Sequence, residues 1–576
     1  MLSKVSNLVV NLNYQGAIIE LEKAISKKPN DINYYTVLID LCLKSDEVEI
    51  AERYVKKALS YEKNNLLINS YLMEINRLKG NLEESKKIAE KLLKNPEART
   101  NIVFVVMFSR LLANIDLKEA EKFLDLHIRT FHNYELLVEM AKVQLELGKL
   151  QKAKEFLDKS ISLERFDRRV YSLYGEYYFK TRKYEESIKN LEKAILFPGN
   201  RNKEYYLLSQ SYYNIRNYEK SLEFLGKLNL REEVTAKVLF VSGKYQEVVK
   251  RFSKSESEIT RYFVEESVIK LSHSELSKDR KNLSETRLKA SKELKKKGIP
   301  YYELYLRRAI RLNPLNYDAW FELGNYYKFY HSPYVALEEL EIAKNLFVND
   351  AKMQDFFESI SDYILNTSKL SSWNIATEKQ KNAKLLIDIE PSNLPIEKDF
   401  YQNATIWAIE SFKLINTTTE VSTENVSPLS YRNYDLVVKV KQDVVKDYMI
   451  LELSFLDPLT YNTLTNATVS QKFSDNFVSE IYYNFKTKMT ALLPSYGVIE
   501  GIKDNLIVAR FSNKPPKAGD KVSITSNDTK SLIANKYITI ATGNVTDTEG
   551  EYALIELDKD FKHLVTIKKG YKVIKN

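Results

Sequence analysis

Small side chains recur along the first two-thirds of the chain at an interval close to 34 residues. Ala17 and Ala51 are one such interval apart, and so are Ala24 and Ala58. The same pattern returns further along, as Ser85/Ala89/Leu92, Ala120/Leu124, Ala153/Leu157/Ser160, Ser187/Leu191/Ala194, Ser221/Leu225/Leu228, Leu306/Ala309 and Ala336/Leu340/Ala343. A constant interval of this length predicts a repeat of two antiparallel helices, because small residues are needed where helix axes approach within about 8–10 Å.

The first helix of each expected pair has its own signature of aromatic residues, leucine and glycine. Its fullest set, with the small residues that follow, is Trp320, Leu323, Gly324, Tyr327, Ala336, Leu340 and Ala343. These residues resemble the tetratricopeptide repeat (TPR), whose 34-residue unit carries Trp, Leu-Gly, Tyr, Ala, Leu and Ala in this order. The resemblance covers roughly residues 10–365. It implies a superhelix of helix pairs with a concave surface that binds other proteins.

The repeat loses its regularity between residues 229 and 300. Residues 243–252 (GKYQEVVKRF) look like half of a shortened unit, and a long polar helix is expected after them. We therefore expect about eight or nine units in two arrays. Array 1 is predicted over residues 1–228, and the shortened unit, the polar helix and array 2 over residues 229–370.

Beyond residue 370 the pattern changes to one of strands and helices. It predicts a strand at 384–390, a helix at 404–415, a hairpin of 434–445 and 448–457 with its turn at Lys446–Asp447, and a helix at 474–489. Five residues fit the pattern D-x-hydrophobic run … L-x-L-x-L-x-D-x-x-T, namely Asp435, Leu451, Leu453, Asp457 and Thr460. This layout is similar to the N-terminal domain of the translocation protein TolB and the middle domain of flagellar assembly protein T. The resemblance implies a small α/β module over residues 371–493.

From residue 494 onward short strands dominate. They are expected at 496–502, 505–511, 521–526, 536–547, 551–557 and 563–567. The segment Lys517-Ala-Gly519-Asp520-Lys-Val522 resembles the K-x-G-D-x-V turn of small β-barrel modules, including the C-terminal domain of flagellar assembly protein T, and Lys569-Gly570 begins a similar segment. A strand preceded by such a glycine can turn sharply, so a small barrel is expected over residues 494–576.

Composition agrees with a mainly helical chain. Gly and Pro together number 15 + 13 = 28 of 576 residues, about 5% where about 12% is average. The 87 basic and 78 acidic residues leave a net charge of +9, too small an excess to predict nucleic-acid binding. The sequence contains no run of about 18 apolar residues, so no membrane-spanning helix is predicted. No cleavage pattern follows the N-terminal segment, so an export signal is not expected.

Sites for chemistry are scarce. The chain carries no motif of a phosphate-binding loop, a zinc protease or a nucleophile elbow. The single cysteine, Cys42, excludes an internal disulfide and falls where a small buried side chain is expected. His127 and His132 lie about 140° apart around a helix and share no metal-facing side. No catalytic residue, metal or cofactor is therefore predicted, and the chain is not expected to be an enzyme.

Candidate binding residues lie at other positions of the first helices. They are Tyr206, Gln210, Tyr213, Phe321, Asn325 and Lys328. Such positions line the concave groove in the TPR family, so the resemblance implies that these side chains contact an extended peptide or a partner helix. Phe321 occupies the place of the lysine in the carboxylate-clamp subtype, which disfavours binding of chaperone tails.

One segment concentrates positive charge. Residues 278–297 contain nine basic and three acidic residues. One interpretation is a solvated helix packed within the array. The other is a basic face for anionic lipid headgroups or an acidic partner, formed by Lys289, Lys292, Lys295, Lys296 and Lys297. No aromatic residues interleave with these lysines, so a nucleic acid is not expected as the partner.

These patterns predict a mainly α chain, a TPR α-α superhelix (solenoid) followed by a small α/β domain and a small C-terminal β-barrel. The expected function is a non-catalytic scaffold whose concave surface binds other proteins during assembly of a multiprotein complex. The resemblances of the C-terminal modules indicate the cell envelope or a flagellar motor, whereas the missing export signal favours the cytoplasm, so the compartment stays open. The alternatives are a cytoplasmic peptide-binding adaptor and a peripheral membrane adaptor.

Overall fold

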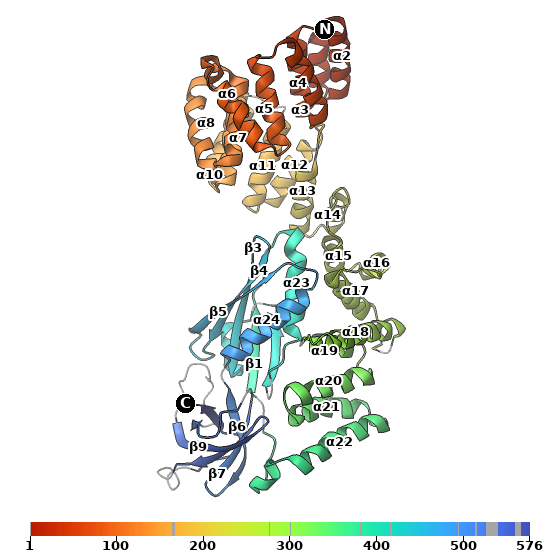
Figure 1. The fold of residues 1–576 in the computed structure, drawn as a ribbon, viewed down its shortest axis with the longest axis vertical. Coiled ribbons are helices and arrows are strands. Elements are labelled where there is room, and N and C mark those ends of the chain that lie inside the picture. Colours follow the sequence, from red (N-terminus) through yellow and green to blue (C-terminus); the bar gives the residue numbers. More distant parts are fainter. Residues whose placement is uncertain are drawn as a thin grey trace. The chain divides into compact units, whose positions relative to one another are not determined.

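The computed structural model describes residues 2–163, 167–272, 274–275, 277–299, 301–380, 383–392, 394–414, 417–424, 426–493, 495–512, 515–525, 539–558 and 566–575. The chain divides into two compact units, unit 1 over Met1–Leu230 and unit 2 over Arg231–Asn576 (Figure 1).

Unit 1 consists of helices in consecutive antiparallel pairs. The helices are α1 (Leu2–Val10), α2 (Tyr14–Lys27), α3 (Ile32–Lys44), α4 (Val48–Tyr61), α5 (Leu66–Leu78), α6 (Leu82–Leu92), α7 (Ile102–Ile115), α8 (Leu117–Phe131), α9 (Tyr134–Glu146), α10 (Leu150–Leu163), α11 (Arg168–Lys180), α12 (Tyr184–Ala194), α13 (Asn202–Asn214) and α14 (Tyr218–Leu225), with the 3-10 turn η1 (Pro96–Thr100) before α7. The predicted solenoid is confirmed.

The repeated small residues lie where the helices of a pair meet. Ala17, Ala51, Ala120 and Ala153 are fully buried. The serines at this position add a hydrogen bond, since Ser85 Oγ donates to the carbonyl of Met73 (2.8 Å) and Ser187 Oγ to that of Gly175 (2.7 Å). The two serines are 187 − 85 = 102 residues apart, which is three intervals of 34, so one contact recurs at the predicted spacing.

Polar side chains begin many of these helices. Asn65, Asn101 and Asp116 each accept hydrogen bonds from backbone N–H groups in the first turn of α5, α7 and α8. Asn and Asp are favoured at this position because their oxygens satisfy donors that the helix cannot. The caps help to fix where α5, α7 and α8 begin.

Unit 2 begins with further helices. They are α15 (Glu232–Val241), α16 (Tyr245–Phe252), α17 (Glu258–Leu271), α18 (Lys278–Lys296), α19 (Tyr302–Leu312), α20 (Tyr317–Tyr330), α21 (Pro333–Leu346) and α22 (Ala351–Thr367), followed by the 3-10 turn η2 (Leu370–Trp373). The signature residues of α20 and α21 are buried in one core. A Cβ on Gly324 would lie 2.9 Å from Leu340 Cδ1, so the two helices cross where glycine permits close approach.

A five-stranded sheet with two helices comes next in the chain. Its strands are β1 (Ala383–Ile389), β2 (Thr417–Ser422), β3 (Leu436–Val445), β4 (Tyr448–Leu456) and β5 (Thr463–Lys472), and its helices are α23 (Ile396–Glu410) and α24 (Phe477–Leu492). The order is β2-β1-β3-β4-β5, with β1 parallel to both β2 and β3 and the remaining pairs antiparallel. The 3-10 turn η3 (Pro428–Asn433) precedes β3, and Lys446 turns the β3–β4 hairpin with φ +54°.

Two expectations for this region need correction. The helix predicted at 404–415 starts at Ile396, directly after Pro395, and ends at Glu410, because Phe400 and Tyr401 are already part of the core. The edge strands β2 and β5 were not predicted, since both are rich in threonine and only weakly alternating.

The last strands close a small barrel, as predicted. They are β6 (Tyr496–Lys503), β7 (Leu506–Phe511), β8 (Lys521–Thr525), β9 (Thr539–Glu549), β10 (Tyr552–Leu557) and β11 (Lys572–Lys575), in the order β10-β7-β6-β11-β8-β9. Gly519 has φ +92°, and the backbone N–H of Lys517 donates to Asp520 Oδ2 at 2.7 Å, which forms the expected turn before β8. Of the strand expected at 563–567, residues 563–565 lie outside the described residues and residues 566 and 567 are not in a strand; β11 closes the barrel instead.

Candidate partner-binding surface

The first helices of successive pairs in unit 1 pack directly against one another. Contacts join α3 to α5, α5 to α7, α7 to α9, α9 to α11 and α11 to α13. Neighbouring helices on the inside of a curved stack approach more closely than those on its outside, so these first helices form the concave side. We call this surface the inner wall of unit 1.

The stack returns on itself, so that early and late parts of unit 1 touch. Arg168 Nη1, at the start of α11, donates to Asp46 Oδ2 (3.1 Å) in the turn between α3 and α4, and the backbone N–H of Asn200 donates to the same oxygen (2.8 Å). Between them Gly199 has φ +109°, and a Cβ there would lie 2.5–2.6 Å from the Arg168 and Asp46 side chains. This bridge therefore requires glycine at 199.

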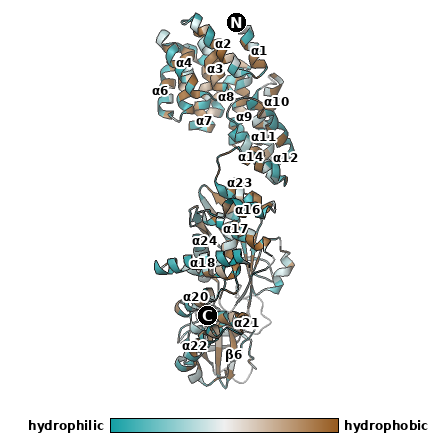
Figure 2. Cartoon of the chain, turned by 90° about the vertical axis from the view of Figure 1, so that its right-hand side faces the viewer, coloured by the Kyte–Doolittle hydropathy of each residue, from teal (hydrophilic) through white to brown (hydrophobic). Residues whose placement is uncertain are grey.

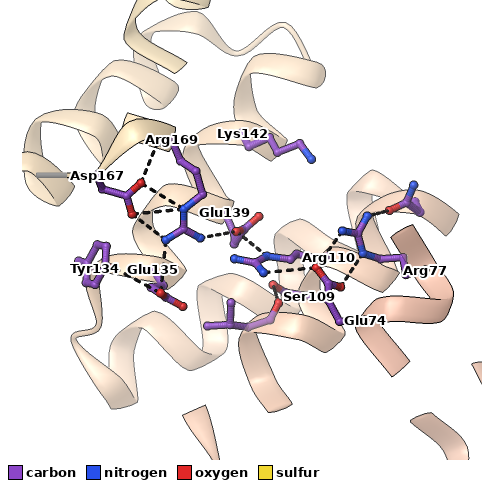
Figure 3. A network of polar contacts seen from close by, with 12 residues as sticks. Glu74, Arg77, Ser109, Arg110, Tyr134, Glu135, Glu139, Lys142, Asp167 and Arg169 are labelled. Atoms are coloured by element: carbon purple, nitrogen blue, oxygen red, sulfur yellow. Dashed lines mark hydrogen bonds and ion pairs between the residues drawn. The ribbon is translucent and has the colours of Figure 1, made fainter. Parts of the chain in front are cut away.

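Acidic and basic side chains alternate across the inner wall (Figure 3). On α5, Arg77 Nε lies 2.6 Å from Glu74 Oε2. On α7, Arg110 Nη1 lies 3.3 Å from Glu74 Oε1, and its Nε lies 2.7 Å from Oε1 of Glu139 on α9. One arginine thus bridges carboxylates of two neighbouring helices.

The alternation continues to α11. Arg169 reaches Glu139 (3.5 Å) and Glu135 (3.3 Å) on α9 and Asp167 (2.7 Å) at the start of its own helix. The Asp167 carboxylate also accepts from the backbone N–H of Arg169 and so caps α11. The charged ladder comprises Glu74, Arg77, Arg110, Glu135, Glu139, Asp167 and Arg169.

Two carboxylates of the ladder, Glu139 and Asp167, have pKa values below their usual range. Burial raises the pKa of Glu139, but the guanidinium groups of Arg110 and Arg169 offset this and hold that pKa below its usual value. Burial is likewise outweighed at Asp167, whose pKa is lowered by Arg169. The carboxylates are the more covered partners: the Glu139 side chain is 9% exposed and that of Arg169 32%.

This arrangement limits what can bind to the inner wall. Planar guanidinium groups suit carboxylates in a two-point contact, and the side chains of Arg110 and Arg169 are 20% and 32% exposed. Lys142 on α9 adds a 44% exposed cation. Because the ladder residues already pair with each other, the inner wall suits a segment whose own charges alternate better than a uniformly acidic one.

Three of the predicted groove residues lie on α13, in the last pair of unit 1. Gln210 is buried and donates to the hydroxyl of Tyr206. Tyr213 is half-buried, with its ring 5.7 Å from that of Tyr218. These side chains lie on the first helix of the last pair, and their contact with a partner stays a prediction.

The charged ladder was not predicted from the sequence, although one signal could have indicated part of it. Subtracting four intervals of 34 residues from Gln210 and Tyr213 gives Glu74 and Arg77 (210 − 136 and 213 − 136). The same repeat positions are therefore aromatic and amide residues in one pair and charged residues in another. Arg110 and Glu139 do not fall on this register; α7 begins 102 − 66 = 36 residues after α5, so Arg110 takes the same place in its helix as Glu74 without the 34-residue spacing.

The other three predicted groove residues lie on α20 in unit 2, next to α22. The ring of Phe321 is 4.3 Å from that of Phe356, and Lys328 Nζ is 4.6 Å from the ring of Tyr363. Asn325 is half-buried between them along the helix. Phe321 and Lys328 therefore contact α22 of the same chain, and the contact of all three residues with a partner stays a prediction.

The α/β module and the barrel cover another face of the unit 2 helices. Trp407 on α23 stacks on Tyr262 (5.3 Å) and meets Phe263 edge-on (4.9 Å), both on α17. Glu303 on α19 accepts from the hydroxyl of Tyr482 (3.1 Å) and pairs with Lys486, both on α24. This face of unit 2 is an internal interface.

The basic face predicted at 278–297 lies on α18, which is drawn almost wholly as hydrophilic in Figure 2. Lys295 Nζ pairs with Glu322 (2.7 Å) and Lys292 Nζ lies 3.8 Å from Asp318, both acids being on α20. Lys289, Lys296 and Lys297 are exposed. The structure therefore neutralises part of this face with acids of the neighbouring helix.

Other residues singled out from the sequence have packing roles. Cys42 is buried, and burial raises the pKa of its thiol to about 12. His127 bonds the carbonyl of Phe123 (2.8 Å) and lies between the rings of Phe123 and Phe131. Among the described residues no group of three or more His, Cys, Asp or Glu side chains is placed to hold a metal ion. None of the described helices has the length and apolar character needed to cross a bilayer.

The family model of the tetratricopeptide repeat matches residues 134–167 and 169–197. These ranges hold the pairs α9–α10 and α11–α12, which match the tetratricopeptide repeat. No curated protein matches the chain.

Three solved structures resemble parts of the chain at low identity. The Cut9–Hcn1 hetero-tetramer of the APC/C is 11% identical, with a TM-score of 0.35, over 62% of this chain and 55% of that chain, about half of its length. A tetratricopeptide repeat protein of Parabacteroides merdae is 17% identical (TM-score 0.28; 42% of this chain, 96% of that chain). PilF of Pseudomonas aeruginosa is 14% identical (TM-score 0.27; 41% and 96%).

Proposed function

We propose that this chain is a non-catalytic scaffold that binds other proteins, and that a partner segment lies along the inner wall of unit 1. The observation that carries the proposal is the charged ladder, which runs across α5, α7, α9 and α11 with Arg110 and Arg169 partly exposed. In unit 2 two of the predicted groove residues, Phe321 and Lys328 on α20, contact α22 of the same chain. Unit 1 is therefore the more available of the two arrays.

The partners are proposed to be components of a multiprotein complex of the cell envelope or a flagellar motor. The resemblance of residues 371–493 to the TolB-type module and of residues 494–576 to the barrel of flagellar assembly protein T supports this setting. The order of strands and helices and the turn at Gly519 are consistent with both resemblances. The domain boundaries after residues 228, 370 and 493 are part of the same proposal.

The test is affinity purification of the tagged full chain from its own cells, with quantification of the proteins that remain bound. The variant carries Lys142→Glu and Arg169→Gln, which change the exposed cations of the inner wall. We expect at least a tenfold loss of one or more partners. The matched control carries Lys122→Glu and Arg129→Gln on α8, a second helix, and should retain them. If both variants retained the same amount of each partner protein, the inner wall would not be the binding surface.

A further inference from the structure

Strand β5 forms a free edge of the five-stranded sheet (Figure 1). It pairs with β4 on one side over Tyr448–Leu456, and in the described residues no strand pairs with its other side. Its outer N–H and C=O groups are thus available to a further strand.

The edge lacks the features that usually prevent strand addition. Natural sheets protect their edges with prolines, inward-pointing charges, bulges or short strands. β5 has ten residues (TLTNATVSQK), no proline and a single charge, Lys472, at its end. The register shift between β4 and β5 lies at Phe455/Leu456, at the opposite end, so most of the strand is regular.

The other edge of the sheet is shorter and is attached to other parts of the chain. β2 has six residues and carries the charged Glu420, which accepts from the hydroxyl of Tyr434 (2.7 Å). Its first residue, Thr417, is hydrogen-bonded to Tyr496 of the barrel (2.7 Å). One edge is therefore short and attached, and the other is long and open.

A groove runs between β5 and α24. It has a volume of about 320 Å³ and is lined by Thr468, Val469, Ser470, Asn484, Thr487, Lys488 and Ala491. The four α24 residues have the spacing i, i+3, i+4, i+7 and so form one stripe along the helix. The lining holds one cation, Lys488, and no carboxylate.

We propose that the β5 edge binds an extended segment of a partner protein as a sixth strand, with an acidic side chain of that segment paired to Lys488. Main-chain hydrogen bonds to β5 supply affinity in this mode, and the pocket beside the edge reads alternate side chains. A carboxylate is the expected side chain because the groove offers it one cation and no competing anion. The site is independent of the inner wall of unit 1.

The test uses the full chain and synthetic probes in fluorescence anisotropy. The acidic probe is fluorescein-labelled Thr-Val-Thr-Glu-Thr-Val-Thr, capped at its C-terminus, and the basic probe has Lys in place of Glu. We expect the acidic probe to bind at least tenfold more tightly. Lys488→Glu should reverse this order, whereas the control Lys521→Glu, exposed on β8 of the barrel, should leave it unchanged.

Backbone methylation of the probe distinguishes strand addition from other binding. A strand faces β5 with only alternate amides, so N-methylation of one alternate set should weaken binding at least tenfold and methylation of the other set less than twofold. Equal losses in both sets, no binding of either probe, or an order unaffected by Lys488→Glu would overturn the proposal. A dimer in sedimentation velocity that the acidic probe dissociates would also overturn it, because the occupant would then be a second copy of the chain.

Discussion

The helices of units 1 and 2 stack in the same way, but their faces have different uses. In unit 1 the inner wall carries the charged ladder, in which the side chains of Arg110 and Arg169 are 20% and 32% exposed. In unit 2 the arginines Arg287 and Arg308 pair with Glu265 at 2.6 Å, and their side chains are only 3–4% exposed. Similar ion pairs are therefore partly exposed to solvent in unit 1 and fully buried in unit 2.

The difference shows that a repeat alone does not determine whether its surface can bind a partner. Segments C-terminal to the repeats cover the surface that the repeats create, or leave it open. In unit 2 the covering elements are α23, α24 and the barrel, which contact α17, α19 and α21 through Trp407, Lys486 and Arg510. A groove assigned from repeat positions alone would count both arrays as binding surfaces.

The largest effect is expected where the cover meets the array. Trp407→Ala removes the ring that packs on Tyr262 and Phe263 and should reduce the free energy of unfolding of unit 2 by about 3–5 kcal/mol. Chemical denaturation of the full chain measures this. Trp407→Phe keeps an aromatic ring and should reduce the free energy of unfolding clearly less. Equal reductions in the two variants would show that the stacking contact is unimportant.

The second largest loss of stability is expected from a change at Glu265, the buried carboxylate that pairs with Arg287 and Arg308. Glu265→Gln leaves Arg287 and Arg308 without their shared anion in a site with little solvent, at a cost of about 3 kcal/mol. This loss of stability is to be compared with that caused by Glu139→Gln in unit 1. A loss below 1 kcal/mol would mean that solvent reaches this cluster.

The equivalent change in the ladder should cost less. Glu139→Gln removes the anion shared by Arg110 and Arg169, but water can solvate these partly exposed groups, so a loss of about 1–2 kcal/mol is expected. Denaturation curves of both variants, recorded in the same buffer, test the difference. If Glu139→Gln proved as costly as Glu265→Gln, the distinction between an open and a sealed array would fail.

Acid should weaken unit 1 through the same residues. The pKa values of Glu139 and Asp167 lie below their usual 4.5 and 3.8 in the folded chain. The unfolded chain therefore binds more protons in this range. Their contribution to stability is complete above about pH 4.5 and is lost as the pH falls through the lowered pKa values. Calorimetry should show a steeper fall in Tm below pH 4.5 for the unaltered chain than for Glu139→Gln.

The smallest effect is expected at the basic helix α18. Reversal of charge at Lys292, Lys295, Lys296 and Lys297 breaks surface ion pairs, which contribute only about 0–1 kcal/mol each. Sedimentation with phosphatidylserine vesicles should show the same bound fraction as for the unaltered chain. A clear drop in binding would support the peripheral membrane adaptor instead.

The sequence allowed the solenoid and the barrel to be predicted because their determinants are local. Small residues at an interval of 34 mark helix crossings, and Gly519 marks a turn, without knowledge of distant contacts. Most of the ladder could not be predicted, because the partners of Arg110 and Glu139 come from four different helices, α5, α7, α9 and α11. The packing of the α/β module on the unit 2 helices could not be predicted either. Tyr262 and Trp407 are far apart in the sequence, and no local pattern indicates that they are in contact.

The bridge of Asp46, Arg168 and Gly199 sets the size of unit 1. Solenoids usually gain or lose repeats by duplication, since each repeat depends only on its neighbours. Here a contact joins positions 122 residues apart, so an inserted helix pair would carry one end of the contact past the other. The contact between Asp46 and Arg168 therefore opposes the insertion of further helix pairs between these residues. Changes in the number of pairs during evolution should be confined to the parts of unit 1 outside residues 46–168.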